Sequence, residues 1–138
     1  MGKQFQEFDH SGDMGIEARG GDEAEALENA TRGLFSLMVR GSVTVRVERE
    51  LAVAAGSDED MLVDWLSEVI AAASMHGEMY GAVRIERTGP HSVRGVIGGE
   101  SIDEGRHQLR FDVKAATYHG LQFERTGRGI RVRVIFDL

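Results

Sequence analysis

Cysteine is absent from the 138 residues of the sequence, and proline occurs once. Without cysteine, the chain cannot form disulfide bonds, thiolate zinc sites or a cysteine nucleophile, and nothing indicates secretion. No apolar run approaches the roughly 20 residues of a transmembrane helix, and residues 1–7 lack the apolar stretch of a signal peptide. We therefore expect a cytoplasmic protein with no membrane association.

Positively charged residues are also fewer than negatively charged ones. The sequence has 16 lysine and arginine residues against 23 aspartate and glutamate residues, a formal net charge of −7. Direct nucleic-acid binding depends on Lys and Arg that neutralise phosphates, so we expect no stable direct binding to RNA or DNA. The hydrophobic fraction of 41% and the length are those of a single globular domain covering residues 1–138.

Two segments have the apolar spacing of amphipathic helices, and each begins with a capping signal and ends at a glycine. The first begins after Asp22, where Glu25 three residues later completes a pattern like a capping box, and it ends at Gly41. The second follows residues 56–60 and ends at Gly77. The sequence therefore predicts two helices.

Most of the remaining chain alternates apolar and polar residues, which is typical of strands. The predicted strands cover residues 4–8, 14–18, 42–54, 80–87, 91–98 and 108–115, a segment beginning at 121, and 130–136. Residues 99–105 and 118–120 are expected to interrupt the strands, and 126–129 to form a hairpin turn. The order β-β-α-β-α-β-β-β-β-β predicts an α+β fold, a two-layer domain of antiparallel-rich sheets with two helices.

A polar loop lies between the first two predicted strands. It contains Asp9 and Asp13, four residues apart, and the chain ends with Asp137 beside the terminal carboxylate of Leu138. Calcium and magnesium prefer oxygen ligands, so convergence of these two ends would create a site for a hard cation. The alternative is that Asp9 is a turn residue bonded to its own backbone and Asp137 is a solvated terminal residue.

Motifs of hydrolases and nucleotide-binding enzymes are missing. The sequence has no Gly-x-Ser-x-Gly elbow, no phosphate-binding loop and no His-x-x-x-His pair. Asp9, His10 and Ser11 are adjacent, but neighbours in an extended segment point in different directions and do not form a triad. Composition and spacing therefore favour a protein that is not an enzyme.

A second polar run, residues 114–120, follows a predicted strand. Its lysine, phenol and imidazole, Lys114, Tyr118 and His119, are suited to proton transfer or to contact with a phosphate of a partner. The alternative is a strand end with solvated polar side chains, and the spacing alone leaves both open.

Three motifs together resemble the archease family. Residues 9–16, DHSGDMGI, are similar to its Asp-His-Thr-Ala-Asp-hydrophobic-Gly-Ile signature, with Ser-Gly in place of Thr-Ala. Residues 113–121, VKAATYHGL, resemble its second signature, and 135–138, IFDL, resemble its Phe-Asp-Ile/Leu ending. The motifs occur in the family's order along the whole chain.

The resemblance implies an activator that is not itself catalytic. Archeases assist the GTP-dependent RNA-splicing ligase, which joins 3′-phosphate or 2′,3′-cyclic phosphate ends to 5′-hydroxyl ends in tRNA splicing and RNA repair, and they promote its guanylylation and multiple turnover. The family binds a divalent cation, usually calcium, although magnesium also suits such ligands. Carried over to this sequence, the ligands are Asp13, Asp137 and main-chain oxygen of Leu138.

Further residues receive weaker assignments from the resemblance. Asp9 is a candidate for supporting the metal ligands, and the candidates for partner contact are His10, Lys114, Tyr118 and His119. One alternative function is a chaperone or modulator of another RNA-modifying enzyme, such as a tRNA methyltransferase. Another is a small metal-dependent hydrolase that uses Asp9, His10 and Asp13.

Overall fold

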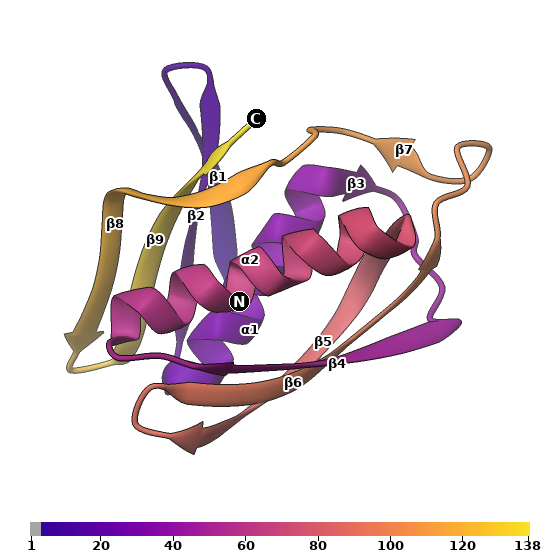
Figure 1. The fold of residues 1–138 in the computed structure, drawn as a ribbon. Coiled ribbons are helices and arrows are strands. Elements are labelled where there is room, and N and C mark those ends of the chain that lie inside the picture. Colours follow the sequence, from indigo (N-terminus) through magenta and orange to yellow (C-terminus); the bar gives the residue numbers. More distant parts are fainter. Residues whose placement is uncertain (1–3) are drawn as a thin grey trace.

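A computed structural model of the chain describes residues 4–138. It contains two long helices and nine strands (Figure 1). In chain order they are β1 (Phe5–His10), β2 (Asp13–Gly20), α1 (Glu23–Met38), β3 (Val39–Arg40), β4 (Val47–Ala54), α2 (Asp58–His76), β5 (Glu78–Gly89), β6 (Ser92–Ser101), β7 (Gln108–Leu109), β8 (Ala115–Thr126) and β9 (Gly129–Asp137).

The strands form antiparallel sheets. The largest has the order β1-β2-β9-β8, the second has the order β4-β6-β5, and β3 pairs with β7. Both helices contact both of the larger sheets, α1 through β2 and β5, and α2 through β8 and β4 (Figure 1). The predicted α+β class, with two helices and antiparallel-rich sheets, is confirmed.

The helix starts follow the predicted capping signals. The Asp22 carboxylate accepts a hydrogen bond from the Glu25 amide at 2.9 Å, and the Glu25 carboxylate accepts one from the Gly21 amide at 2.9 Å, which completes the capping box. At the start of α2, the Ser57 hydroxyl accepts from the amide of Asp60. Among residues 4–138, neither helix is both long and apolar enough to cross a membrane.

The core is centred on Trp65, which is fully buried on α2. Its indole N–H donates to the Thr31 hydroxyl on α1 at 2.9 Å, so the two helices share a buried hydrogen bond. A Cβ built on Gly95 of β6 would lie 2.7 Å from the Trp65 ring, which shows how closely the ring approaches this strand. One aromatic side chain thus joins α1, α2 and the β4-β6-β5 sheet.

Two of the predicted strands are shorter than their alternation suggested. Residues 42–46 precede β4 instead of extending it, because the Thr44 amide donates to the Glu100 carboxylate at 2.6 Å. Residues 110–114 follow the short β7, because the amides of Arg110 and Phe111 donate to carbonyls at the end of α1. At residue 44 a side chain takes the amide that a regular strand would use, whereas residues 110–111 donate to the last turn of a helix and not to a strand.

The predicted break at residues 118–120 is instead a bulge inside β8. The register between β8 and β9 shifts between Thr117 and Gln122, and Gly120 has a positive φ of 62°. Strand pairing resumes after the extra residues and continues to the turn. The hairpin predicted at residues 126–129 is confirmed, with Thr126 paired to Gly129.

Glu100 lies in the predicted loop 99–105, but it belongs to β6 and is 3% exposed. Its carboxylate contacts the ring of the buried His107 at 3.1 Å and also pairs with Arg106. Because the Asp103 amide donates to His107 Nδ1, the proton of the neutral ring lies on Nε2, where it donates to Glu100. This cluster anchors residues 101–107 to β6.

The Glu100 cluster makes part of the unfolding free energy dependent on pH in the acid range. The hydrogen bond from the Thr44 amide, with those from His107 and Arg106, lowers the pKa of Glu100 from 4.5 to about 2. The folded-state pKa lies below the unfolded-state value, so the contribution is present above about pH 4.5 and is lost as the pH falls from about 4.5 to 2. In Glu100→Gln, we expect the unfolding free energy to depend less steeply on pH in this range.

Urea unfolding of the wild type and Glu100→Gln between about pH 2.5 and 7 measures this slope. Glu48→Gln, which alters an exposed carboxylate on β4, is the control and should keep the wild-type slope. Equal slopes for the wild type and Glu100→Gln would contradict the assignment.

Candidate functional site

The polar loop is a tight turn between β1 and β2. His10 is paired with Asp13, so only Ser11 and Gly12 connect the strands. Both turn residues have positive φ, 47° and 91°, as in the type I′ turns that match the twist of a hairpin. The turn thus holds Asp13 at the first position of β2.

The β2–β9 register brings Asp13 beside the end of the chain. Met14 pairs with Phe136, and Asp13 and Asp137 occupy the next position of the two strands. Met14 and Phe136 are buried on the core face, so the two aspartates lie on the opposite, outer face. Cross-strand neighbours on one face have Cβ atoms roughly 5 Å apart, so the two carboxylates can reach one ligand.

The second polar run contributes a third segment to this region. The Lys114 amide donates to the Asp137 carbonyl at 2.9 Å, and Ala115 pairs with Asp137. Lys114 is exposed, and Leu138 is partly buried against the core. Three parts of the chain that are distant in sequence therefore meet where β2 begins and β9 ends.

His10 and His119 meet across the outer face of the sheet. Their ring centroids are 5.1 Å apart, although β1 and β8 are the two outermost strands and are separated by about three strand spacings, roughly 14 Å. The β8 bulge must therefore lean over the sheet, which also explains why Ile135 is 1% exposed on the outer face. We call His10, Asp13, Lys114, His119 and Asp137 the tip.

The remaining predicted residues lie elsewhere. Asp9 pairs with Met14 and therefore shares the core-side face of the sheet, opposite to Asp13. The Tyr118 hydroxyl donates to the Asp60 carboxylate in the first turn of α2 at 2.5 Å, and this bond raises the pKa of Tyr118 to about 12. The structure thus brings Asp13, Asp137, His10 and His119 to one face, joins Lys114 to Asp137 through its main-chain amide, and separates Asp9 and Tyr118 from them.

The tip has part of the donor set that a hard cation requires. No hydrogen bond or ion pair within residues 4–138 engages the carboxylates of Asp13 and Asp137. Over the same residues, no group of three or more His, Asp and Glu side chains is arranged to hold a metal. A cation at the tip would therefore take two side-chain carboxylates and complete its shell with main-chain or terminal oxygen of Leu138 and with water.

Arg133 is a neighbour of the tip that sequence reasoning did not single out. Its guanidinium lies 4.2 Å from the centroid of the Phe8 ring and donates to the Gly120 carbonyl at 3.3 Å. The Phe8 ring itself covers Gly15, where an added Cβ would lie 2.1 Å from the ring. The alternation of the last strand placed Arg133 on the outer face, but nothing in the sequence paired it with Phe8.

Comparison with known proteins places the fold and the motifs in one family. The model of the archease protein family (MTH1598/TM1083) matches residues 5–138. The archease of Methanosarcina acetivorans is 29% identical over 143 residues, covering 100% of this chain and 98% of its own. The archease of Thermococcus gammatolerans is 31% identical over 131 residues, covering 92% of each chain.

Two solved structures are also similar to this chain in sequence and fold. Protein 1598 of Methanobacterium thermoautotrophicum is 31% identical, with a TM-score of 0.82 and coverage of 99% of both chains. A protein from Thermotoga maritima, described as an archease and possible chaperone, is 25% identical with a TM-score of 0.68, covering 95% of this chain and 94% of its own. The fold is therefore that of a known class of small α+β proteins. The chain belongs to the archease family.

Proposed function

We propose that this protein is a non-catalytic activator of the GTP-dependent RNA-splicing ligase, promoting its guanylylation and multiple turnover. The observation that carries the proposal is the tip, where Asp13, Asp137 and Lys114 come together from three separate segments. Family membership supports the same function. The three archease signatures of the sequence thus each contribute at least one residue to the tip.

A divalent cation, calcium or magnesium, would add positive charge at the tip and connect the first loop to the end of β9. Asp13 and Asp137 would hold it with main-chain oxygen of Leu138. Without the ion, two like charges lie close together on adjacent strands, which favours a ligand of opposite sign. The residues of the chain hold this surface in one arrangement, with the two histidines packed beside it.

Activation requires that the tip binds one state of the ligase more tightly than another. His10 and His119, which pack against each other, and the exposed Lys114, whose main chain bonds to Asp137, would supply donors for contact with the ligase or its nucleotide. Tyr118 would contact a partner only through a surface shared with α2, because Asp60 holds its hydroxyl. We expect the partner to lie over the tip.

The tip offers little support for hydrolysis. Asp9 lies on the opposite face of the sheet from His10 and Asp13, so these three side chains do not converge. Ser11 occupies the turn with a positive φ, and its hydroxyl makes no hydrogen bond among residues 4–138. We propose that the protein has no catalytic activity of its own.

The experiment is to measure guanylylation of the RNA ligase from the same organism with GTP and metal, with and without this protein in substoichiometric amount. Stimulation is expected, and it should persist through several rounds of joining. The ligase alone and this protein alone are the controls. Absence of stimulation of an active ligase would contradict the proposal.

The description of the Thermotoga maritima relative as a possible chaperone supports a second candidate function. On this alternative, the protein is a chaperone or modulator of another RNA-modifying enzyme, such as a tRNA methyltransferase. Affinity capture with the ligase and with the methyltransferase, each purified, distinguishes the two candidates, because only the true partner should be retained by the wild-type tip.

A further inference from the structure

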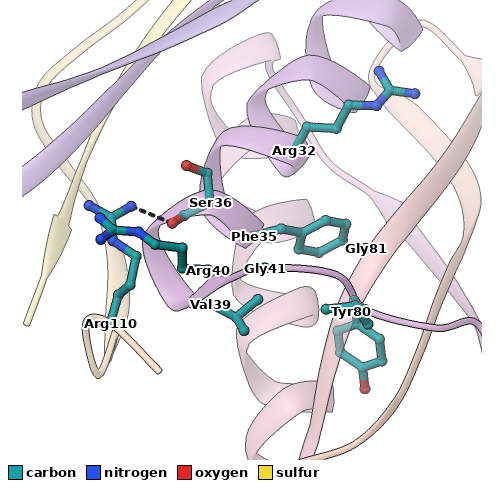
Figure 2. A pocket seen from close by; sticks show the side chains of 10 residues that line it. Arg32, Phe35, Ser36, Val39, Arg40, Gly41, Tyr80, Gly81 and Arg110 are labelled. Atoms are coloured by element: carbon teal, nitrogen blue, oxygen red, sulfur yellow. Dashed lines mark hydrogen bonds between the residues drawn. The ribbon is translucent and has the colours of Figure 1, made fainter. Parts of the chain in front are cut away.

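A pocket of about 390 Å³ lies at the C-terminal end of α1, beside β3 and the start of β5 (Figure 2). None of its residues belongs to the tip. Its lining includes Arg32, Phe35, Val39, Arg40, Tyr80 and Arg110. Three of its lining residues are arginines, although the chain has a net charge of −7.

One of the three arginines is neutralised within the fold. Arg110 donates to both oxygens of the Glu7 carboxylate, at 2.7 and 3.1 Å, and to the Ser36 carbonyl in the last turn of α1. The Ser36 hydroxyl also donates to Glu7. Arg110 therefore has a structural task, which is to join β1 to the end of α1, and its charge is compensated.

The other two arginines have no carboxylate partner among residues 4–138. Arg32 donates to the neutral Asn29 side chain at 2.7 Å, and Arg40 is exposed and contacts no acceptor in this part of the chain. Figure 2 shows Arg32 and Arg40 extending on either side of Phe35. The pocket thus carries uncompensated positive charge at its rim.

The floor of the pocket is apolar. Phe35 and Tyr80 are 6% and 2% exposed, and their ring centroids lie 6.1 Å apart. Val39 completes this floor. A cationic rim over an apolar floor suits a ligand with an anionic group attached to an organic body. The volume exceeds what inorganic phosphate alone would occupy and falls within the usual range for small-ligand sites.

We propose that this pocket binds a phosphate ester of nucleotide size, whose phosphate is held by Arg40 and whose organic part lies over Phe35 and Val39. Guanidinium groups bind phosphate oxygens with two parallel hydrogen bonds, so an arginine at the rim suits a phosphate. This binding site is separate from the proposed activation of the ligase, and the proposal does not depend on that function.

The test is to titrate the full chain with AMP, adenosine and inorganic phosphate, and to monitor binding by amide NMR shifts and by calorimetry. We expect AMP to shift the amides of residues 32–43 and 80–81, and adenosine and phosphate to bind more weakly. Arg40→Gln should weaken AMP binding by about tenfold or more, because it removes a charged hydrogen bond to phosphate, and Arg32→Gln should weaken it less because Arg32 lies on the other side of Phe35 (Figure 2).

Arg128→Gln is the matched control. Arg128 is an exposed arginine in the β8–β9 turn, away from the pocket, so this variant should bind AMP like the wild type. A 5′-phosphorylated trinucleotide then identifies the source of the phosphate ester. If it displaces bound AMP more effectively than AMP itself does, the ligand is an RNA end. If it displaces AMP less effectively, the ligand is a free nucleotide.

Two outcomes would overturn the proposal. One is that AMP does not shift the amides of the pocket. The other is that Arg40→Gln lowers the melting temperature but leaves AMP affinity unchanged, which would mean that Arg40 only stabilises the C-terminal end of α1. Thermal unfolding of each variant, monitored by circular dichroism, separates a loss of binding from a loss of folding.

Discussion

The variants Asp13→Asn and Asp137→Asn are expected to lose both stabilisation by calcium and stimulation of the ligase. Each removes one of only two side-chain carboxylates that adjacent strands bring together at the tip. In the wild type, calcium at 100 times its Kd should raise the unfolding free energy by about 2.7 kcal/mol. Thermal unfolding with calcium or with EDTA measures this difference, and the guanylylation assay measures the loss of activation.

Glu48→Gln is the matched control for the tip variants, because it neutralises one exposed carboxylate on β4 of the other large sheet. It should retain the calcium effect. Asp9→Asn is a sharper comparison within the same hairpin. Asp9 lies on the opposite face from Asp13, so we expect only a small change. If calcium stabilised Asp13→Asn as strongly as the wild type, the cation would not bind at the tip.

Trp65→Ala is expected to lower the unfolding free energy by about 3–5 kcal/mol. The ring is fully buried, lies against Gly95 and donates to Thr31, so its removal leaves a cavity at the junction of both helices and the β4-β6-β5 sheet. Equilibrium urea unfolding, followed by circular dichroism, measures the change. A loss of this size is a large part of the stability of a typical domain.

Two milder variants separate the ring of Trp65 from its hydrogen bond. Thr31→Val removes the acceptor and leaves the indole N–H unpaired, which should cost about 1–3 kcal/mol. Trp65→Phe keeps an aromatic ring and should cost less than Trp65→Ala. A Trp65→Ala variant as stable as Trp65→Phe would show that the cavity at this junction collapses without penalty.

The elements that the sequence predicted well are those whose signals are local. The capping box at Asp22 and Glu25 and the glycine at the end of α2 depend only on neighbouring residues, and both are present in the fold. Apolar spacing likewise located both helices, although α1 ends at Met38 and not at the predicted Gly41, because Val39 and Arg40 pair with β7. By contrast, residues 42–46 alternate like a strand, but the Glu100 carboxylate takes the Thr44 amide, and no local pattern reveals a partner 56 residues away.

For the candidate site too, some features were predicted from the sequence and others depend on contacts that the sequence does not reveal. The sequence indicated that the ends of the chain meet, and the β2–β9 register brings Asp13 and Asp137 together. It grouped Asp9 with Asp13 because they are close in sequence, whereas strand alternation places them on opposite faces. The contact between His10 and His119 depends on a bulge that the sequence analysis interpreted as a break.

The position of β9 between β2 and β8 has a consequence for how the protein is made in the cell. A ribosome delivers β1 and β2 first and their central neighbour last, so the edge of β2 that pairs with β9 remains unpaired until the end of synthesis. An incomplete chain that ends before residue 129 would lack β9, which is a central strand of this sheet and not an edge strand. Two open strand edges would then be exposed, and such nascent fragments are natural substrates for chaperones and proteases.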